Sequence, residues 1–224
     1  MYLRNEHYLQ YIKDQDEIAL TTHVLKLQKE NKRFVHQLER KQLGKIPSLT
    51  EKDCETIQRY RWYLEDTLLA LKNLGSDYMF TKSEQKAFAF QKNVPKITRV
   101  GFYIGGYLGG IEKYDIEINE DEALMSYSLS DTHSVPPIIV MEPDHLCKEE
   151  FFRFIHSIHM GEWKKAYINA QIDDMFYDNI IWGVEIFYAD GLEKVTFGGF
   201  NAFPYNFEQF LNFFKRYKRK VYTL

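Results

Sequence analysis

The stretch Ile97–Leu129 reads ITRVGFYIGGYLGGIEKYDIEINEDEALMSYSL, and the fold class follows from its pattern. On both sides of the glycine-rich segment Gly105–Gly110, apolar and polar residues alternate with a period of two. This period is typical of strands that bury one face, whereas a helix would repeat every 3.6 residues or so. Asn119–Glu122 has the composition of a second turn. The stretch therefore predicts three antiparallel strands joined as a meander.

Further strands and two helices are expected toward the C-terminus. Ile138–Met141 is a short apolar run that is typical of a buried strand. An Asp-Gly pair separates Ile181–Tyr188 from Leu192–Phe197, which predicts a hairpin. One helix is expected to begin near His145, and another to cover Asn206–Lys218, where phenylalanines recur at helical spacing. This part of the chain thus combines about five strands with two helices.

The N-terminal part has a helical pattern. Asp14–Leu43 contains neither proline nor glycine and is rich in good helix formers, and Gly44 and Pro47 then end the helix. Ser48–Glu51 has the spacing of a capping box, so a second helix is expected from there to Gly75. Two long helices with a short connection form an antiparallel hairpin.

The fold class predicted from these patterns is α+β, with an antiparallel sheet that packs against helices. We expect three parts: a helical hairpin over residues 1–76, a connecting segment over 77–96, and an α+β domain over 97–224.

Composition excludes several classes of protein. The chain has 224 residues, of which 45% are hydrophobic and 16% aromatic, so it is neither disordered nor a low-complexity repeat. Cys54 and Cys147 are too few for a disulfide framework or a cysteine-based zinc site. No apolar run is long enough for a membrane helix, and the first ten residues lack the apolar core of a signal peptide. We therefore expect a cytoplasmic protein without a membrane partner.

Charge is unevenly distributed along the chain. Residues 1–100 contain 18 lysines and arginines against 13 acidic residues, whereas residues 101–214 contain 6 against 19. A basic run, Lys215–Lys220, follows. An acidic surface repels phosphate backbones and attracts basic proteins. The distribution therefore favours a protein partner, in particular a basic one, and argues against nucleic acid.

No complete catalytic motif is present. The four glycines within Gly105–Gly110 join two predicted antiparallel strands and do not open a helix, so they do not form a phosphate-binding loop. A serine-nucleophile elbow is also missing from the sequence. We expect no cofactor, no metal and no catalytic residues, and the sequence favours a protein that is not an enzyme.

Two alternatives remain open. His156 and His159 are three residues apart on a predicted helix, with Glu162 three residues further on, which suits a metal-dependent hydrolase. Alternatively, the basic residues of the hairpin and of Lys215–Lys220 suit a nucleic-acid-binding protein. The acidic charge of residues 101–214 argues against the second alternative.

The stretch Trp163–Phe207 has the most distinctive pattern in the chain. Its spaced aromatic, asparagine and proline positions are Trp163, Tyr167, Trp182, Asn201 and Pro204. This pattern resembles a C-terminal module of uncharacterised bacterial proteins, some of which are similar to immunity or anti-defence proteins. The resemblance implies binding of a single protein partner and a structural or binding role for these five residues.

Together these observations predict a non-enzymatic bacterial protein that acts by protein–protein binding, as an immunity protein, an inhibitor or an anti-defence protein. The acidic pair Asp173 and Asp174, in a predicted loop, joins the five residues named above as candidate binding residues. A homodimer through the N-terminal helices is a further expectation, because the predicted hairpin is amphipathic.

Overall fold

A computed structural model describes residues 6–41, 44–106, 109–130, 139–169 and 179–218. The chain divides into two compact units. The first unit comprises Met1–Lys41 and Ser48–Thr81, and the second comprises Gln42–Pro47 and Lys82–Leu224. The main boundary between the two units lies between Thr81 and Lys82. This position is inside residues 77–96, the segment that was expected to connect the helical hairpin to the α+β domain.

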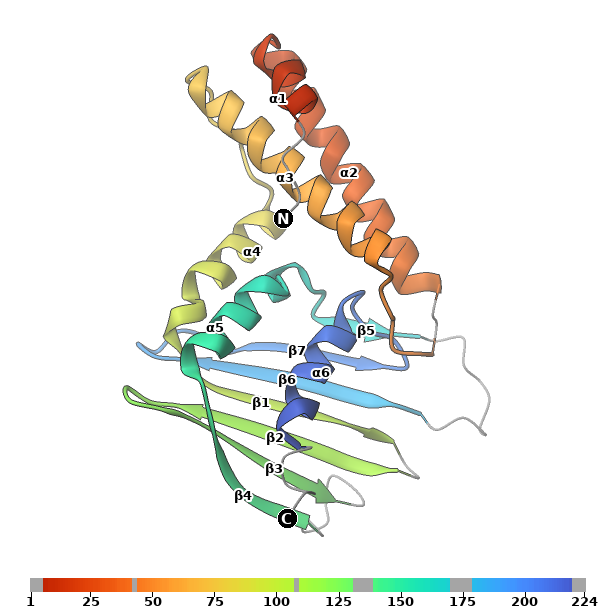
Figure 1. Ribbon diagram of the computed structural model, residues 1–224, viewed down its shortest axis with the longest axis vertical. Helices are drawn as coiled ribbons and strands as arrows, with labels where there is room; N and C mark the ends of the chain where they lie inside the picture. Colours follow the sequence, from red (N-terminus) through yellow and green to blue (C-terminus); the bar gives the residue numbers. More distant parts are fainter. Residues whose placement is uncertain (1–5, 42–43, 107–108, 131–138, 170–178, 219–224) are drawn as a thin grey trace. The chain divides into compact units, whose positions relative to one another are not determined.

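The first unit consists of three helices, α1 (Glu6–Lys13), α2 (Glu17–Lys41) and α3 (Glu51–Asn73). The helices α2 and α3 lie side by side and run in opposite directions (Figure 1). Their core is small, because the fully buried side chains that cluster there are Ile12, Leu20, Val24 and Leu71. The predicted helical hairpin is present, with α1 as an additional short helix that packs on α3.

The start of α3 differs in detail from the prediction. The N-cap is Thr50, and the capping box joins Thr50 to Asp53, two residues later than the expected pairing of Ser48 with Glu51. The Thr50 hydroxyl accepts a hydrogen bond from the Asp53 amide at 3.2 Å, and the Asp53 carboxylate accepts one from the Thr50 amide at 3.1 Å. This hydrogen bonding lowers the pKa of Asp53, because it favours the ionised carboxylate.

The second unit is built on a seven-stranded sheet with the order β4-β3-β2-β1-β6-β7-β5. The predicted meander is confirmed, since β2 pairs antiparallel with both β1 and β3. The strand bounds are β1 (Ile97–Gly106), β2 (Gly110–Ile118), β3 (Ala123–Ser130), β4 (Ile139–Leu146), β5 (Ala166–Ile168), β6 (Ile181–Tyr188) and β7 (Val195–Phe200).

The sheet is mixed and larger than expected. The short strand β5 pairs parallel with β7, whereas an antiparallel sheet of fewer strands was predicted. Its three residues are too few for an alternating pattern, so period alone could not predict the strand. At the β1–β2 turn, a Cβ atom on Gly105 would overlap the backbone carbonyl of Gly110, so glycine is needed for this close approach.

Helices α4 (Lys82–Asn93), α5 (Lys148–Ser157) and α6 (Phe207–Lys218) complete the second unit, with the short 3₁₀ helices η1 (Val94–Lys96) and η2 (Met160–Glu162). The helices α5 and α6 lie against one face of the sheet (Figure 1). Their phenylalanines form the core with Phe102 of β1, whose ring centre lies 4.9 Å from that of Phe210 and 5.0 Å from that of Phe214. The α+β class is therefore confirmed.

Candidate functional site

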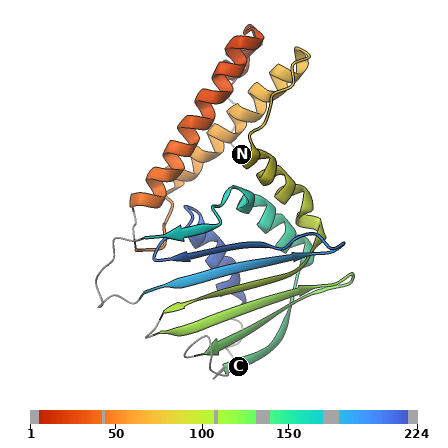
Figure 2. The same cartoon turned by 180° about the vertical axis from the view of Figure 1, so that it is seen from behind.

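The two faces of the sheet differ in what covers them. Along β1, Val100, Phe102 and Ile104 are buried, whereas Arg99 and Tyr103 lie on the opposite face. Figure 2 shows this opposite face without a helix of the described second unit over it. We call it the open face. The alternation that predicted the meander therefore also determines which side chains of β1 lie on the open face.

Strand register brings a group of polar and aromatic side chains together on the open face. Residues opposite each other on paired strands share a face. Gly101 of β1 is flanked by Asp115 on β2 and Glu185 on β6, and Arg99 pairs in register with Phe187 on β6. Lys194, just before β7, reaches the same group. We name this group the open-face cluster; its members are Arg99, Tyr103, Asp115, Glu185, Phe187 and Lys194.

The ring of Phe187 lies at the centre of the cluster between two cations. The guanidinium carbon of Arg99 and the ammonium nitrogen of Lys194 each lie 5.5 Å from the centre of this ring. Cations at this distance are attracted to the electron-rich face of an aromatic ring. The cluster therefore combines an aromatic surface with positive charge on both sides.

Each of these cations is also held by a carboxylate. Arg99 Nε donates to both carboxylate oxygens of Asp115, at 2.9 and 3.1 Å, and this hydrogen bonding raises the pKa of Arg99. Lys194 Nζ donates to Glu185 Oε1 at 2.6 Å. About half of the Arg99, Lys194 and Glu185 side chains is exposed, at 49%, 50% and 47%. Ion pairs this exposed contribute only about 0–1 kcal/mol each to stability, so the fold does not depend on them.

Tyr103 extends the cluster along β1 toward the sheet centre. Its ring lies over Gly183 of β6, where a Cβ atom would come within 2.5 to 2.7 Å of the ring and hydroxyl atoms. Burial, and to a lesser extent the Glu185 carboxylate, raises the pKa of the Tyr103 hydroxyl. Above Gly101, between Tyr103 and Arg99, nothing lies within 4 Å of a Cβ position. On the open face, the aromatic ring of Tyr103 therefore lies next to the unfilled space above the backbone of Gly101.

Three of the predicted binding residues are aromatic side chains buried inside the second unit. Trp163, Tyr167 and Trp182 have exposed fractions of 5%, 6% and 1%. The Trp163 and Trp182 ring centres are 6.1 Å apart, and those of Tyr167 and Trp182 are 5.8 Å apart. The structure thus brings these three residues together in the core, where they contact one another and α6.

Asn201 and Pro204 are also buried, and they shape the chain between β7 and α6. Asn201 has a left-handed backbone with φ of 48°. Its side-chain oxygen accepts a hydrogen bond from the Ile180 amide at 2.8 Å, and its side-chain nitrogen donates to Asn179 at 2.8 Å. The Pro204 carbonyl accepts from the Phe207 amide at 3.1 Å, where α6 begins. Asp173 and Asp174 lie outside the described residues.

The histidines of the metal hypothesis do not share a helix. The helix α5 ends at Ser157, so it contains His156, whereas His159 follows with a left-handed backbone at φ 51°. His159 Nδ1 lies 3.9 Å from Glu162 Oε1 and 3.3 Å from Gln91 Nε2, and His156 is exposed. Within the described ranges, no group of three or more His, Cys, Asp or Glu residues is placed to hold a metal ion.

Sequence reasoning missed the open-face cluster, although part of the signal was present. Period two places Arg99, Tyr103 and Asp115 on one face of the meander. Phe187 and Lys194 join them only through the pairing of β1 with β6, which lies far away in the sequence.

The chain matches no protein-family profile, no curated protein and no solved structure. Among the helices in the described part of the chain, none combines the length and the apolar character needed to cross a lipid bilayer.

Proposed function

We propose that this protein acts without catalysis, by binding a protein partner on the open face of its sheet. The observation that carries this proposal is the open-face cluster, in which Phe187 and Tyr103 lie among two cations and two carboxylates. Aromatic residues and arginine are enriched at the centres of protein interfaces, where a few such residues supply most of the binding energy.

The charges of the cluster favour a protein over nucleic acid. Arg99 and Lys194 are each neutralised by a carboxylate, Asp115 and Glu185. Binding to a phosphate backbone depends on unpaired cations that replace counterions. The excess of acidic residues over residues 101–214, 19 against 6, adds attraction toward a basic surface. The proposed partner is therefore a protein with a basic binding surface.

The type of partner follows from the sequence pattern alone. The resemblance of Trp163–Phe207 to a module found in some immunity or anti-defence proteins supports an inhibitory complex with one bacterial protein. The buried positions of Trp163 and Trp182 suggest that this pattern builds the scaffold, while the open face provides the contact.

A matched pair of variants tests this proposal. Phe187→Ala removes the central ring of the cluster, which lies 5.5 Å from each of its two cations, and adds no charge to the surface. Phe88→Ala is the control, because Phe88 is a phenylalanine on α4 with an exposed fraction of 52%. Wild-type protein and each variant are used as bait in a native lysate at low salt, and captured protein, nucleic acid and metal are quantified.

The proposal predicts one protein captured in near-equal amount by wild type and by Phe88→Ala, and lost with Phe187→Ala. The association rate with the purified partner should fall as salt rises, since steering by opposite charges is screened. Equal capture by all three baits would contradict a role of the open face. Capture of nucleic acid or of a stoichiometric metal ion, without a protein, would contradict the proposed class of function.

A further inference from the structure

A row of apolar side chains continues the open face toward the β5 edge of the sheet. Ile181 of β6 lies opposite Phe200 of β7, and Phe200 lies opposite Ile168 of β5. The chain neighbours Trp182 and Tyr167 point into the core, so Ile181 and Ile168 lie on the open face. We name Ile168, Phe200 and Ile181 the apolar row. The core of the described second unit includes none of them, and Ile168 has an exposed fraction of 73%.

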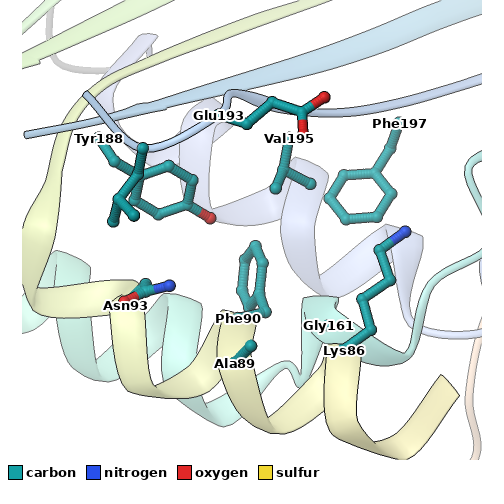
Figure 3. Close-up of a pocket in the computed structure, with 10 residues that line it drawn as sticks. Lys86, Ala89, Phe90, Asn93, Gly161, Tyr188, Glu193, Val195 and Phe197 are labelled. Atoms are coloured by element: carbon teal, nitrogen blue, oxygen red, sulfur yellow. The ribbon is translucent and has the colours of Figure 1, made fainter. Parts of the chain in front are cut away.

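Next to the apolar row, the backbone of β7 is uncovered at Gly198. Figure 3 shows the other side of this strand, where Val195 and Phe197 point toward Phe90 of α4 around a small pocket. Gly198 follows Phe197 and therefore faces the opposite way, onto the open face. Apart from its chain neighbours, the only described atom within 4 Å of a Cβ position on Gly198 is the Trp182 backbone oxygen, at 3.3 Å. The space above Gly198 is therefore open at the level of the backbone.

Apolar groups border this space. Gly198 lies opposite Gly183 on β6, and the ring of Tyr103 lies over Gly183. On the other side, Gly198 lies opposite Ala166 of β5, which is exposed. Phe200 is two residues further along β7 and lies on the same face. A large apolar side chain above Gly198 would thus contact two aromatic rings, and ring edges attract ring faces.

A carboxylate lies diagonally across from the same space. Glu185 pairs in register with Thr196, which is two residues before Gly198 on β7. Burial and, after it, the charge of Glu185 raise the pKa of the Tyr103 hydroxyl, so this carboxylate acts on the side chain that borders the space. Lys194 binds Glu185 Oε1, but a carboxylate has about four acceptor positions. Glu185 can therefore accept a further hydrogen bond from a cation.

The connection between β5 and β6 adds negative charge at the apolar row. Residues 170–178 contain three aspartates and no lysine or arginine. This connection begins two residues after Ile168 and ends three residues before Ile181, so the chain ties both of its ends to the apolar row. Opposite charges attract across an interface and like charges repel. This end of the open face therefore favours a basic segment over an acidic one.

We propose that the space above Gly198 receives an aromatic side chain from a segment of the protein partner in which arginine or lysine flanks that side chain. The aromatic ring lies between Tyr103 and the apolar row, and a flanking cation binds Glu185. Tryptophan and arginine are the residues that most often dominate the binding energy of interfaces. The inference rests on the proposed function, because it names the partner segment that contacts the open face.

Blocked five-residue peptides are the probes, and binding to the full chain, labelled with nitrogen-15, is followed through amide chemical shifts. The first peptide has tryptophan between two arginines, with a glycine at each end. The second has glutamates in place of the arginines, and the third has alanine in place of tryptophan. Wild type should bind the first with a Kd of about 1 mM and the others at least about fivefold more weakly. The shifts should concentrate at Gly198, Ala166 and Phe200.

A matched pair of variants tests the apolar row. Ile168→Ser shortens the row at an exposed position, and Leu69→Ser removes an isomeric side chain from α3, where Leu69 has an exposed fraction of 55%. Leu69→Ser should bind the first peptide like wild type, and Ile168→Ser at least about threefold more weakly. The absence of saturable binding, equal binding of the glutamate peptide, or wild-type binding by Ile168→Ser would overturn the proposal.

The same variants separate this inference from the proposed function. Phe187→Ala changes the open-face cluster outside the apolar row, whereas Ile168→Ser changes the row alone. If the protein partner is lost with Phe187→Ala and retained by Ile168→Ser, the proposed function stands and the present inference is wrong. If Phe187→Ala retains the partner while the first peptide binds wild type and not Ile168→Ser, the row binds basic aromatic segments and the proposed role of the cluster is wrong.

Discussion

The ring of Tyr103 on β1 lies over Gly183 on β6, so close that a Cβ atom at position 183 would displace the end of the Tyr103 side chain. We therefore expect Gly183→Ala to push the Tyr103 ring aside and to change the free energy of unfolding by less than about 1 kcal/mol, because the atoms in the way are the far end of a flexible side chain. The variant should also bind the partner more weakly, since Tyr103 belongs to the open-face cluster. Urea denaturation and partner binding measure the two effects.

Gly101→Ala is the matched control for that substitution. Gly101 is two residues before Tyr103 on β1 and therefore lies on the same face of the sheet. A Cβ atom on Gly101 would have nothing within 4 Å. An alanine there should leave stability unchanged or raise it by about 0.5 kcal/mol, because it restricts the unfolded chain. Equal partner binding by Gly101→Ala and Gly183→Ala would contradict the placement of the Tyr103 ring over Gly183.

The second prediction separates a structural role of Trp163 from a binding role. Its indole nitrogen donates to Asn206 Oδ1 at 2.9 Å, and the Asn206 side-chain nitrogen donates to the Ile158 carbonyl at 2.6 Å. Trp163→Phe leaves the buried Asn206 oxygen without its donor, which should cost about 1–3 kcal/mol of stability. Thermal or urea denaturation checks this value.

Trp62→Phe, at a half-buried tryptophan of α3, is the comparison for that change. It should have a smaller effect, because no hydrogen bond to a buried asparagine is lost. The structural role of Trp163 would be contradicted if Trp163→Phe had wild-type stability but no longer bound the partner. Trp163 would then be a residue of the binding surface.

The third prediction concerns pH and the first unit. Tyr8 links three elements there: its hydroxyl lies 2.6 Å from Thr67 Oγ1 and 2.9 Å from His23 Nε2, and its ring stacks on Tyr63 at 3.7 Å between centres. Burial, reinforced by the charge of Lys26, lowers the pKa of His23 below its usual 6.5. The unfolded chain therefore binds a proton more readily than the folded chain does.

The stabilising effect of neutral His23 is fully present above pH 6.5 and is lost as the pH falls toward the lower pKa of the folded state. Unfolding midpoints measured from pH 7.5 to pH 5 should fall more steeply for wild type than for His23→Gln. His36→Gln, at an exposed histidine of α2, should behave like wild type. A pH profile of His23→Gln that matched that of wild type would contradict the prediction.

The sequence predicts those features of the fold that depend on residues close together in the chain, and misses those that depend on residues far apart. Period two in Ile97–Leu129 is a local property, and it correctly predicted three strands and the faces of Arg99 and Phe102. The pairing of β1 with β6 joins residues that are far apart in the sequence, so no local pattern could place Phe187 beside Arg99. The open-face cluster was missed for this reason.

The buried tryptophans show a different limit. Trp163 and Trp182 stood out in the sequence because of their type and spacing, but a tryptophan suits a core and an interface equally well. Only the structure shows that both point into the second unit. Similarly, the spacing of His156 and His159 suits one helical face, but α5 ends between them at Ser157.

The last prediction is self-association through α2. Ile18 and Leu25 have exposed fractions of 77% and 55%, and residues seven apart lie on the same side of a helix. Leu69 of α3 and Leu74, which caps the C-terminal end of α3, are also exposed, but residues five apart point in different directions and form no continuous stripe. If two copies of α2 pack antiparallel over this stripe, Lys26 of each copy approaches Glu17 of the other. Opposite charges at these positions would favour that arrangement.

We therefore expect the double variant Ile18→Glu/Leu25→Glu to be monomeric in sedimentation-velocity experiments at concentrations where wild type forms dimers. Both side chains are exposed, so each unit should keep its fold and its circular dichroism spectrum. Leu69→Glu is the control, because Leu69 is as exposed as Leu25, at 55%, but lies on α3. It should dimerise like wild type. A monomeric wild type over the whole concentration range, or dissociation caused equally by Leu69→Glu, would contradict a dimer through α2.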